Sequence, residues 1–395
     1  MFNNSMNNWI FSQIDGLVSQ YFTVTSVSYR ALGPQNQPFP VQAIPSYEVL
    51  RRSDLSENME AVSSQLQKIG YVPILRSHPT EKSRGVLYIF PHTDKRLVTG
   101  QNWKTPLILF ALTVLSVFFV GLMLWNFLRQ VNPSLSPIET GLFYTVGLIG
   151  IVGIHELGHM VASRLHGIKA SFPYFLPIPF GYGTFGAFIT QKTPTKSRND
   201  LFDVGLAGPL FGFVPALIFS VLGLVLSTVI PLTEVPIQLL EDPLALDFRL
   251  FSESRFRILL FELLAFIILP TSQSGVEVFL NPLAIAGYIG FLLTGLNLIP
   301  IGQLDGGHVA RALFDERHHK TLTYISAGFM VILGFWFFAL LIIMFYSQTG
   351  HAGPLDDVSQ VSSGRKIIAI LSIGLAILCL PVPSELFQMV FPFLG

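Results

Sequence analysis

Long apolar runs dominate the sequence from residue 106 onward. Each is about 20 residues long, the length that an α-helix needs to cross the hydrocarbon core of a bilayer. Hydrophobic residues make up 51% of the chain and charged residues only 12%, whereas soluble proteins carry about 25% charged residues. The sequence therefore predicts an α-helical polytopic membrane protein with about six spans. We expect them near residues 106–128, 138–165, 202–230, 282–304, 322–346 and 366–391.

One further apolar run, at residues 256–270, is short and contains Glu262. If this run does not cross, the basic groups flanking the spans fall on one face of the membrane and the acidic loop at residues 347–364 falls on the other, as the positive-inside rule requires. If it crosses, the rule is violated after residue 304. We therefore expect residues 231–281 to be an insertion with an interfacial or re-entrant helix. This choice leaves Arg249, Arg255 and Arg257 on the less basic face.

Residues 1–104 have ordinary polar sequence and no run long enough to span. Alternation and helical spacing divide them into a strand, a helix and two strands at residues 46–53, 55–70, 71–77 and 85–92. We predict a small soluble α+β domain here, followed by a transmembrane domain over residues 105–395. The N-terminus lacks the basic region and cleavage site of a secretory signal, so the first span is expected to act as one.

The segment GIHELGHM, at residues 153–160, puts ionisable side chains inside an expected span. Such residues are costly in a membrane and are usually functional. His155 and His159, four residues apart, project from one helix face and can share one metal ion, while Glu156 stands where HExxH metalloproteases keep their general base. The alternative is that the histidines make helix contacts and Glu156 forms an internal hydrogen bond.

A catalytic zinc usually takes three protein ligands. The chain has one cysteine, Cys379, so the ligands must be histidines and carboxylates. Asp305 is the outstanding candidate for the third, because Pro300 and Gly302 interrupt the helix just before it and broken backbone at membrane depth is tolerated beside a site. Gly306 and Gly307 would let Asp305 approach the other helix closely.

The expected topology agrees with this choice. The spans carrying His155 and Asp305 point the same way, and each site lies about 15 Å before the basic end of its helix. The two half-sites therefore meet at one depth. His308, three residues after Asp305, is expected to be a partner behind the ligands or a helix-end contact, with ligation as the alternative.

The motifs HELGH and NLIPIGQLDGGH resemble those of the site-2 protease family of intramembrane zinc metalloproteases. The block GTFGAFITQKTPTKSRNDLFDVGLAGPL is similar to the segment that links these motifs in the family, and the N-terminal extension resembles the branch of the plastid ethylene-dependent gravitropism-deficient proteases and their bacterial relatives. The resemblance implies that His155, His159 and Asp305 bind one zinc ion per chain, that Glu156 is the base, and that Asn297 lies near the bound peptide. Gly302, Phe211 and Gly212 depart from residues common in the family.

These features predict an intramembrane zinc endopeptidase acting on transmembrane protein substrates. We expect the edge of a strand at residues 183–190 to bind unwound substrate by β-addition, with a plain packed hairpin as the alternative. The clamp residues would be Gly183, Thr184, Phe185 and Gly186. A net charge of +0 indicates no nucleic-acid partner.

The rival class is a non-catalytic membrane receptor or transporter with a His/Asp metal site, against which an unligated Glu156 argues. We expect an integral protein of the prokaryotic plasma membrane, with the N-terminal domain and basic loops in the cytoplasm.

Overall fold

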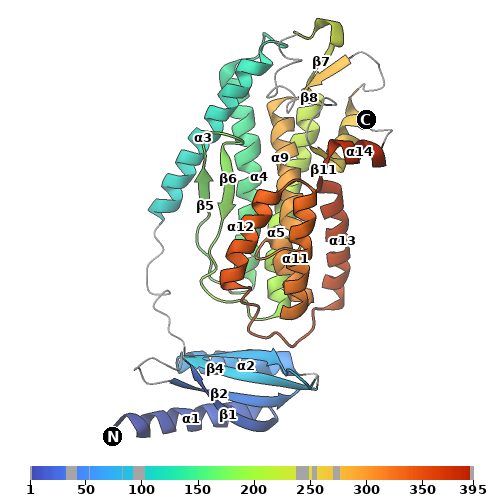
Figure 1. The fold of residues 1–395 in the computed structure, drawn as a ribbon. Helices are drawn as coiled ribbons and strands as arrows, with labels where there is room; N and C mark the ends of the chain where they lie inside the picture. The colour runs from blue at the N-terminus through green and yellow to red at the C-terminus, as the bar shows by residue number, and fades with distance from the viewer. Residues whose placement is uncertain are drawn as a thin grey trace.

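Two units make up the chain, an N-terminal α+β domain and a tall helical bundle above it (Figure 1). The computed structural model describes residues 2–32, 42–52, 54–81, 83–91, 103–236, 249–250, 256–269 and 276–391. The boundary expected at residue 104 follows a stretch outside these residues.

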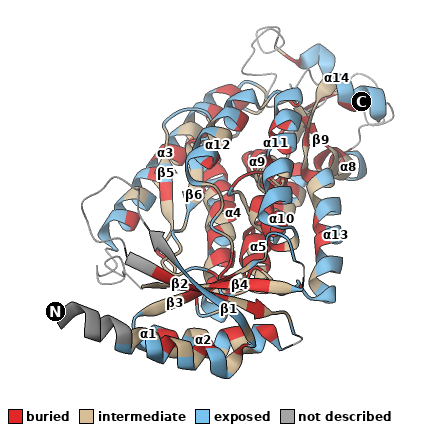
Figure 2. Cartoon of the chain, turned by 60° about the horizontal axis from the view of Figure 1, so that its bottom comes forward, coloured by how far each residue is buried: buried red, intermediate tan, exposed pale blue. Residues whose placement is uncertain are grey.

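The N-terminal domain is a four-stranded antiparallel sheet in the order β1-β2-β4-β3, with two helices on one face (Figure 2). Its elements are α1 (Phe2–Tyr21), β1 (Val24–Leu32), β2 (Gln42–Leu50), α2 (Leu55–Lys68), β3 (Tyr71–Ser77) and β4 (Arg84–Pro91). Helix α2 buries Leu55, Met59, Val62 and Leu66, the spacing of one helix face, against this sheet. The predicted α+β character is confirmed, and α1 and β1 are additions that the sequence interpretation missed.

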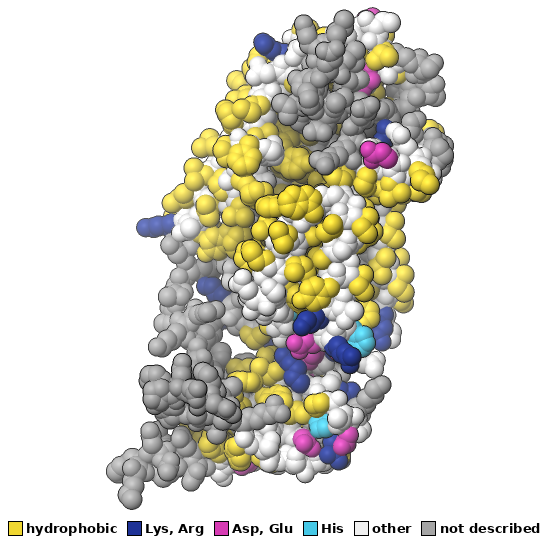
Figure 3. Space-filling view, viewed as in Figure 1, with side chains coloured by type: hydrophobic (Ala, Val, Ile, Leu, Met, Phe, Trp, Pro, Cys, Tyr) yellow, Lys and Arg dark blue, Asp and Glu magenta, His cyan; other side chains and the backbone are white. Residues whose placement is uncertain are grey.

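Three helices of the bundle are long and apolar enough to cross a membrane, judged by length and composition over the described residues. They are α3 (Lys104–Leu128), α4 (Pro137–Leu165) and α5 (Arg198–Val225). Shorter helices pack beside them, namely α9 (Pro282–Leu298), α10 (Asp305–Leu313), α11 (Glu316–Ile332), α12 (Trp336–Thr349), α13 (Ser363–Cys379) and α14 (Ser384–Val390). Buried residues gather along α4, α5 and α9 in the centre, while the outer faces are exposed (Figure 2) and largely apolar (Figure 3).

Helices α4 and α9 run in the same direction. The last turn of α4 contacts the first turn of α5 through His166, whose ring nitrogens lie 3.0 Å from Asp200 Oδ1 and 2.9 Å from Asp203 Oδ2. At the other end of α5, strand β7 (Thr228–Pro231) pairs with β10 (Val276–Phe279), which leads into α9. The chain therefore goes down α4, up α5 and down α9, as the metal hypothesis requires.

Residues 322–346 do not form the single spanning helix that we predicted. Helices α11 and α12 form a hairpin that turns at Gly334, which has φ 89°. This left-handed conformation is open to glycine and strained for other residues. The hairpin returns to the end from which it started, because Gln303 Nε2, just before α10, donates to Thr349 Oγ1 at 3.0 Å.

As a consequence, the acidic loop at residues 347–364 lies at the basic end of the bundle, next to the soluble domain (Figure 1). We predicted the opposite face. The difference arises because Asp357 in this loop pairs with Arg198 and Arg311, so its charge neutralises basic residues at that end. The last predicted span also ends early, since α13 stops at Cys379 and β11 (Pro381–Pro383) follows.

The described parts of residues 231–281 include a ten-residue helix, α8 (Leu259–Ile268), about 15 Å long and too short to cross. It follows β9 (Phe256–Ile258), which pairs with β11. A short 3₁₀ helix (Leu232–Glu234) and β8 (Arg249–Leu250) complete this region. Arg257 lies 3.8 Å from Glu262 in the buried interior. The predicted insertion also includes residues 237–248, 251–255 and 270–275, which lie outside the described residues.

A β-hairpin stands between α3 and α4 (Figure 1). Its strands are β5 (Tyr174–Pro177) and β6 (Thr184–Phe188), paired antiparallel. Strand β5 packs mainly on α3, and β6 contacts α4. The hairpin thus stands beside the helix that carries HELGH.

Candidate metal centre

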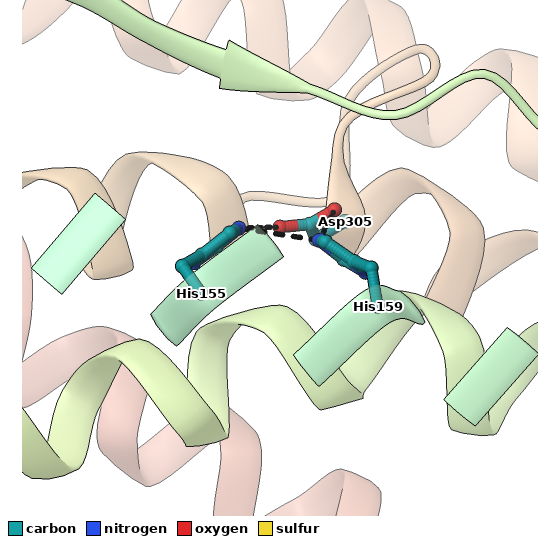
Figure 4. A group of neighbouring side chains, drawn as sticks. All are labelled: His155, His159 and Asp305. Atoms are coloured by element: carbon teal, nitrogen blue, oxygen red, sulfur yellow. Dashed lines mark hydrogen bonds and ion pairs between the residues drawn. The ribbon is translucent and has the colours of Figure 1, made fainter. Parts of the chain in front are cut away.

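Two histidines of α4 and one carboxylate of α10 converge inside the bundle (Figure 4). His155 Nε2 lies 3.1 Å from Asp305 Oδ2, and His159 Nε2 lies 3.2 Å from Asp305 Oδ1. The two Nε2 atoms are 3.2 Å apart. The structure therefore brings together the three residues that the sequence interpretation selected as ligands.

The separations between these atoms have a simple geometric meaning. Ligands about 2.0–2.1 Å from one tetrahedral zinc ion stand about 3.3 Å from one another. The three observed separations are close to this value, although the two histidines approach different carboxylate oxygens of Asp305. Asp305 Oδ2 is also buried, and its 3.1 Å contact with His155 Nε2 does not have hydrogen-bond geometry, which is costly unless another partner is present. The donor set and its spacing fit a metal ion.

The carbonyl of Val204 on α5 sets the tautomer of His159. Because a carbonyl only accepts, the contact of 2.8 Å between His159 Nδ1 and Val204 O makes Nδ1 the protonated nitrogen. In the neutral ring, Nε2 then carries the lone pair and points at Asp305. Such support behind a ligand raises its basicity and holds the ring orientation. No sequence pattern points to Val204, since its contribution is a backbone atom.

Glycines of α5 make the room for the centre. A Cβ added at Gly208 would overlap His159 Nε2 and lie 2.7 Å from His155 Nε2. One added at Gly205 would meet His308 Cβ at 2.7 Å, and one at Gly212 would meet His155 Cβ at 3.0 Å. Small residues commonly line close helix contacts in membranes. Their spacing in GLAGPLFG was the available signal, and our interpretation used this block only as a family resemblance.

Asp305 begins helix α10, immediately after the broken segment at residues 299–304. We expected Gly306 and Gly307 to face α4, but they do not. A Cβ on Gly306 would collide with the backbone of Leu298, and one on Gly307 would lie 2.5 Å from Gly302 O. These glycines therefore let α10 begin in close contact with the preceding backbone. The glycines that pack closely against α4 belong to α5.

Glu156 is buried at 4% exposure on α4, and its Oε2 has no hydrogen-bond partner among the described residues. A buried carboxylate oxygen without a partner is unusual in a settled structure. Glu156 adjoins His155 in the chain and precedes His159 by less than a turn. It is a free proton acceptor or donor beside the ligand set.

His308 contacts another histidine instead of the ligands. Its Nδ1 lies 2.8 Å from His351 Nε2, while the backbone N–H of Gly353 donates to His351 Nδ1 at 3.0 Å. His351 therefore donates from Nε2 to His308. Within the described residues the structure gives His308 no bond to Asp305. The sequence interpretation did not single out His351.

The residues predicted to bind substrate come from α9 and from the β5–β6 hairpin. Asn297 on α9 is half-buried and has no hydrogen-bond partner among the described residues. Phe185 is 65% exposed on β6, and Thr184 Oγ1 donates to Leu176 O at 2.9 Å within the hairpin. Gly183 and Gly186 have φ of 88° and 91°. Substrate binding by these residues stays a prediction.

The fold and the site define a helical membrane protein with a buried His-His-Asp centre able to hold a metal ion. The chain belongs to peptidase family M50, whose model matches residues 143–341. This confirms the predicted membership of the site-2 protease family.

Curated relatives agree with the family. The probable zinc metalloprotease EGY2, chloroplastic, is 30% identical in Oryza sativa subsp. indica over 66% of this chain, and 32% identical in Arabidopsis thaliana over 59%. The probable zinc metalloprotease EGY1, chloroplastic, of Arabidopsis thaliana is 31% identical over 63%. The matches cover 45%, 40% and 44% of these relatives, so the chain spans less than half of their length. No solved structure matches.

The EGY relatives confirm the predicted branch. They are chloroplast proteins of plants, and the comparisons therefore do not support the predicted prokaryotic plasma membrane. That the chain is a membrane protein is supported by both its family and its apolar helices.

Proposed function

We propose that the chain is a zinc metalloendopeptidase that hydrolyses peptide bonds within or near transmembrane segments. One observation carries the proposal: the Nε2 atoms of His155 and His159 lie 3.2 Å from each other, and each lies 3.1–3.2 Å from one of the two carboxylate oxygens of Asp305, close to the spacing of zinc ligands. The unpartnered Glu156 beside them supports catalysis over a purely structural site. The zinc metalloprotease names of the relatives support the same conclusion.

The residues of the chain have distinct tasks in this reaction. A bound zinc ion lowers the pKa of water and polarises a carbonyl. Glu156 accepts a proton from the attacking water at its free carboxylate oxygen and returns it to the leaving amine. Val204 and Gly208 hold the geometry, the first by orienting His159 and the second by leaving space between the rings.

A second part of the proposal concerns substrate. A transmembrane helix hides its carbonyls in internal hydrogen bonds, so the segment must unwind before it is cut. Strand β6, which contacts α4, offers an edge to which an extended peptide can pair. The green strand that crosses Figure 4 above the three side chains belongs to this hairpin by its colour. Gly183, Thr184, Phe185, Gly186 and Asn297 are the proposed substrate contacts.

We further propose that the soluble-domain end of the bundle faces the cytoplasm or its equivalent. Exposed lysines and arginines gather at this edge of the apolar band (Figure 3), as the positive-inside rule favours. Arg257, which counted against this orientation, is buried beside Glu262. We also propose that residues 1–104 form the soluble domain, that residues 105–395 form the protease domain and that residues 231–281 are an insertion in it.

The activity is tested with purified protein in liposomes that also contain transmembrane reporter peptides. We expect cleavage that is lost on zinc removal by a chelator and restored by zinc. Glu156→Gln should keep one zinc per chain and lower kcat by about 10²–10⁴-fold, the usual contribution of a general base. His155→Ala should lose both zinc and cleavage.

The rival function makes a different prediction in the same assay. If the wild type binds zinc, but no transmembrane or soluble peptide is cut and Glu156→Gln changes nothing, the chain is a receptor or transporter with a metal site. Trapping experiments with Glu156→Gln would then also recover no substrate.

The substrate strand is tested separately. Phe185→Pro removes the backbone N–H of Phe185, the donor that we propose pairs with substrate, and should raise KM while leaving the zinc content unchanged. Phe185→Ala, which keeps the donor, is the matched control for the backbone effect. Unchanged KM in both variants would make β5–β6 a plain packed hairpin.

A further inference from the structure

Asp357 stands where three parts of the molecule meet. Its carboxylate accepts two hydrogen bonds from Arg311, at 2.8 Å and 2.6 Å, and one from Arg198 Nε at 3.2 Å. Its carbonyl accepts from Arg198 Nη2 at 2.9 Å. Its backbone N–H donates to Leu75 O in β3 of the soluble domain at 3.1 Å.

The two arginines belong to the helices that build the metal centre. Arg311 lies six residues after Asp305 in α10, a helix of only nine residues, so any tilt of α10 moves both. Arg198 is the first residue of α5, the helix that orients His159 through Val204 and leaves space through Gly208. Asp357 therefore ties together the helix of the third ligand and the helix behind the histidines.

The same loop is bound firmly to the soluble domain. Leu75 N–H donates to Leu355 O at 2.8 Å, and Leu355 N–H donates to Thr195 O at 2.9 Å, so the loop continues the sheet from β3 to the segment before α5. The Leu355 side chain belongs to the buried core of the soluble domain. Arg76 on β3 donates to Pro354 O at 2.7 Å and to Ala352 O at 3.1 Å.

The ion pair between Arg311 and Asp357 is buried, so its loss is costly. Arg311 is 1% exposed and Asp357 is 6% exposed. A buried ion pair tolerates the loss of one partner poorly, because the other charge is left without compensation. Two parallel bonds from a guanidinium to a carboxylate also restrict orientation as well as distance. If the docked loop shifts, α10 must therefore move with it, or the buried hydrogen bonds between Arg311 and Asp357 break.

We propose that Asp357 is a positioning residue that couples docking of the soluble domain to the geometry of the metal centre. The docked domain holds α10 in the orientation that presents Asp305 to the histidines, and so it sets metal affinity. Linkage is reciprocal, so metal binding must stabilise the docked domain by the same factor. This inference rests on the proposed function only in taking the centre to bind zinc.

The first test measures zinc affinity by competition with a chelator in the full-length protein. Asp357→Asn should weaken zinc binding by about 10-fold, within the usual range of coupling between two distinct sites. Asp357→Glu, which keeps the charge, should recover part of this loss. The matched control is Glu262→Gln, because Glu262 forms another buried ion pair, 3.8 Å from Arg257, that joins α8 to β9 and does not involve α10. The control should keep wild-type affinity.

The second test asks whether the effect passes through docking. Arg76→Ala loosens the loop from β3 and should weaken zinc binding in the same direction as Asp357→Asn. If one coupling is involved, the double variant should show less than the product of the two effects. Independent, multiplying effects would overturn the proposed path.

The third test needs no variant and therefore holds even if Asp357→Asn does not fold. Adding zinc to wild-type protein should slow hydrogen exchange of the amides of Leu75, Leu355 and Asp357, while β1 is unchanged. Exchange at these amides that is indifferent to zinc would overturn the proposal, as would wild-type zinc affinity in Asp357→Asn. These readouts do not need peptide cleavage, so an inactive protein would refute the proposed function without deciding this inference.

Discussion

At the scale of single residues, the metal centre depends on the small size of glycine at one position as much as on the ligand residues. His155, His159 and Asp305 supply the ligand atoms, but the Nε2 atoms converge only because α5 has no side chain at Gly208. The motif HELGH predicts two ligands on one helix face. It contains no information about the third helix that must leave space beside them.

Gly208→Ala tests this dependence. The added Cβ would overlap His159 Nε2, so we expect zinc content to fall to background and cleavage to be lost. Zinc per chain is measured by atomic emission after purification. Gly153→Ala is the control, because its Cβ would meet nothing within 4 Å although it lies two residues before His155. A Gly208→Ala protein with one zinc per chain would contradict the geometry.

His351 provides a prediction about pH. Burial, together with the nearby His308, His319 and Arg311, lowers the pKa of His351 to about 2, whereas an unfolded histidine titrates near about 6.5. Between these values only the unfolded chain binds the proton, so stability falls as pH drops below about 6.5, by at most about 1.4 kcal/mol per pH unit. Above that range His351 contributes no pH dependence.

His351→Gln should therefore flatten the loss of thermal stability between pH 7 and pH 5, measured by melting of the purified protein. His318→Gln is the control for replacing a histidine at the surface, since the His318 side chain is 71% exposed. Equal slopes in His351→Gln and wild type would contradict the buried, neutral state of His351.

At the scale of elements, hydropathy identified apolar segments but not where they turn. Residues 322–346 read as one span because Gly334 is a single small residue in an apolar run. In the structure its φ of 89° ends α11, and Phe335 N–H donates back to Met330 O at 2.8 Å. This bond closes the helix end before α12 begins. A helical hairpin and a single spanning helix can have the same amino-acid composition, so hydropathy does not distinguish them.

Gly334→Ala should destabilise the hairpin by about 1–2 kcal/mol, the cost of a left-handed conformation for a residue with a Cβ. The expected readout is a lower melting temperature with unchanged zinc content, because the turn is not part of the metal centre. Gly328→Ala in the middle of α11 meets nothing within 4 Å and should be neutral or slightly stabilising. If residues 322–346 formed one straight helix, both substitutions would stabilise it.

At the scale of the whole molecule, the hairpin reverses the side on which the acidic loop lies. The positive-inside rule counts lysines and arginines along the chain, and it places the loop at residues 347–364, which has neither, on the opposite face. In the structure Asp357 is buried against Arg198 and Arg311. The acidic loop therefore joins the basic end to the soluble domain.

Single cysteines report this topology. In a Cys379→Ser background, cysteines replacing the exposed residues Lys320 and Gln360 should react with a membrane-impermeant reagent from the same side, and one replacing Gln130 should react from the other. Labelling is done on sealed, oriented vesicles and again after lysis, which controls for buried thiols. Gln360 labelled together with Gln130 would restore the single span at residues 322–346.

The sequence by itself determined the chemistry and the local structure of this protein. HELGH on an apolar helix, Asp305 after a broken one, the spans at α3, α4 and α5, and the α+β character of the N-terminal domain all follow from residue type and short-range spacing. Only the tertiary structure decided the room made by Gly208, the support from the Val204 carbonyl, the hairpin at Gly334 and the docking of the acidic loop. Each of these depends on backbone atoms, a single φ angle or contacts between residues far apart in the chain, such as Leu75 with Asp357, and spacing along a sequence carries no record of them.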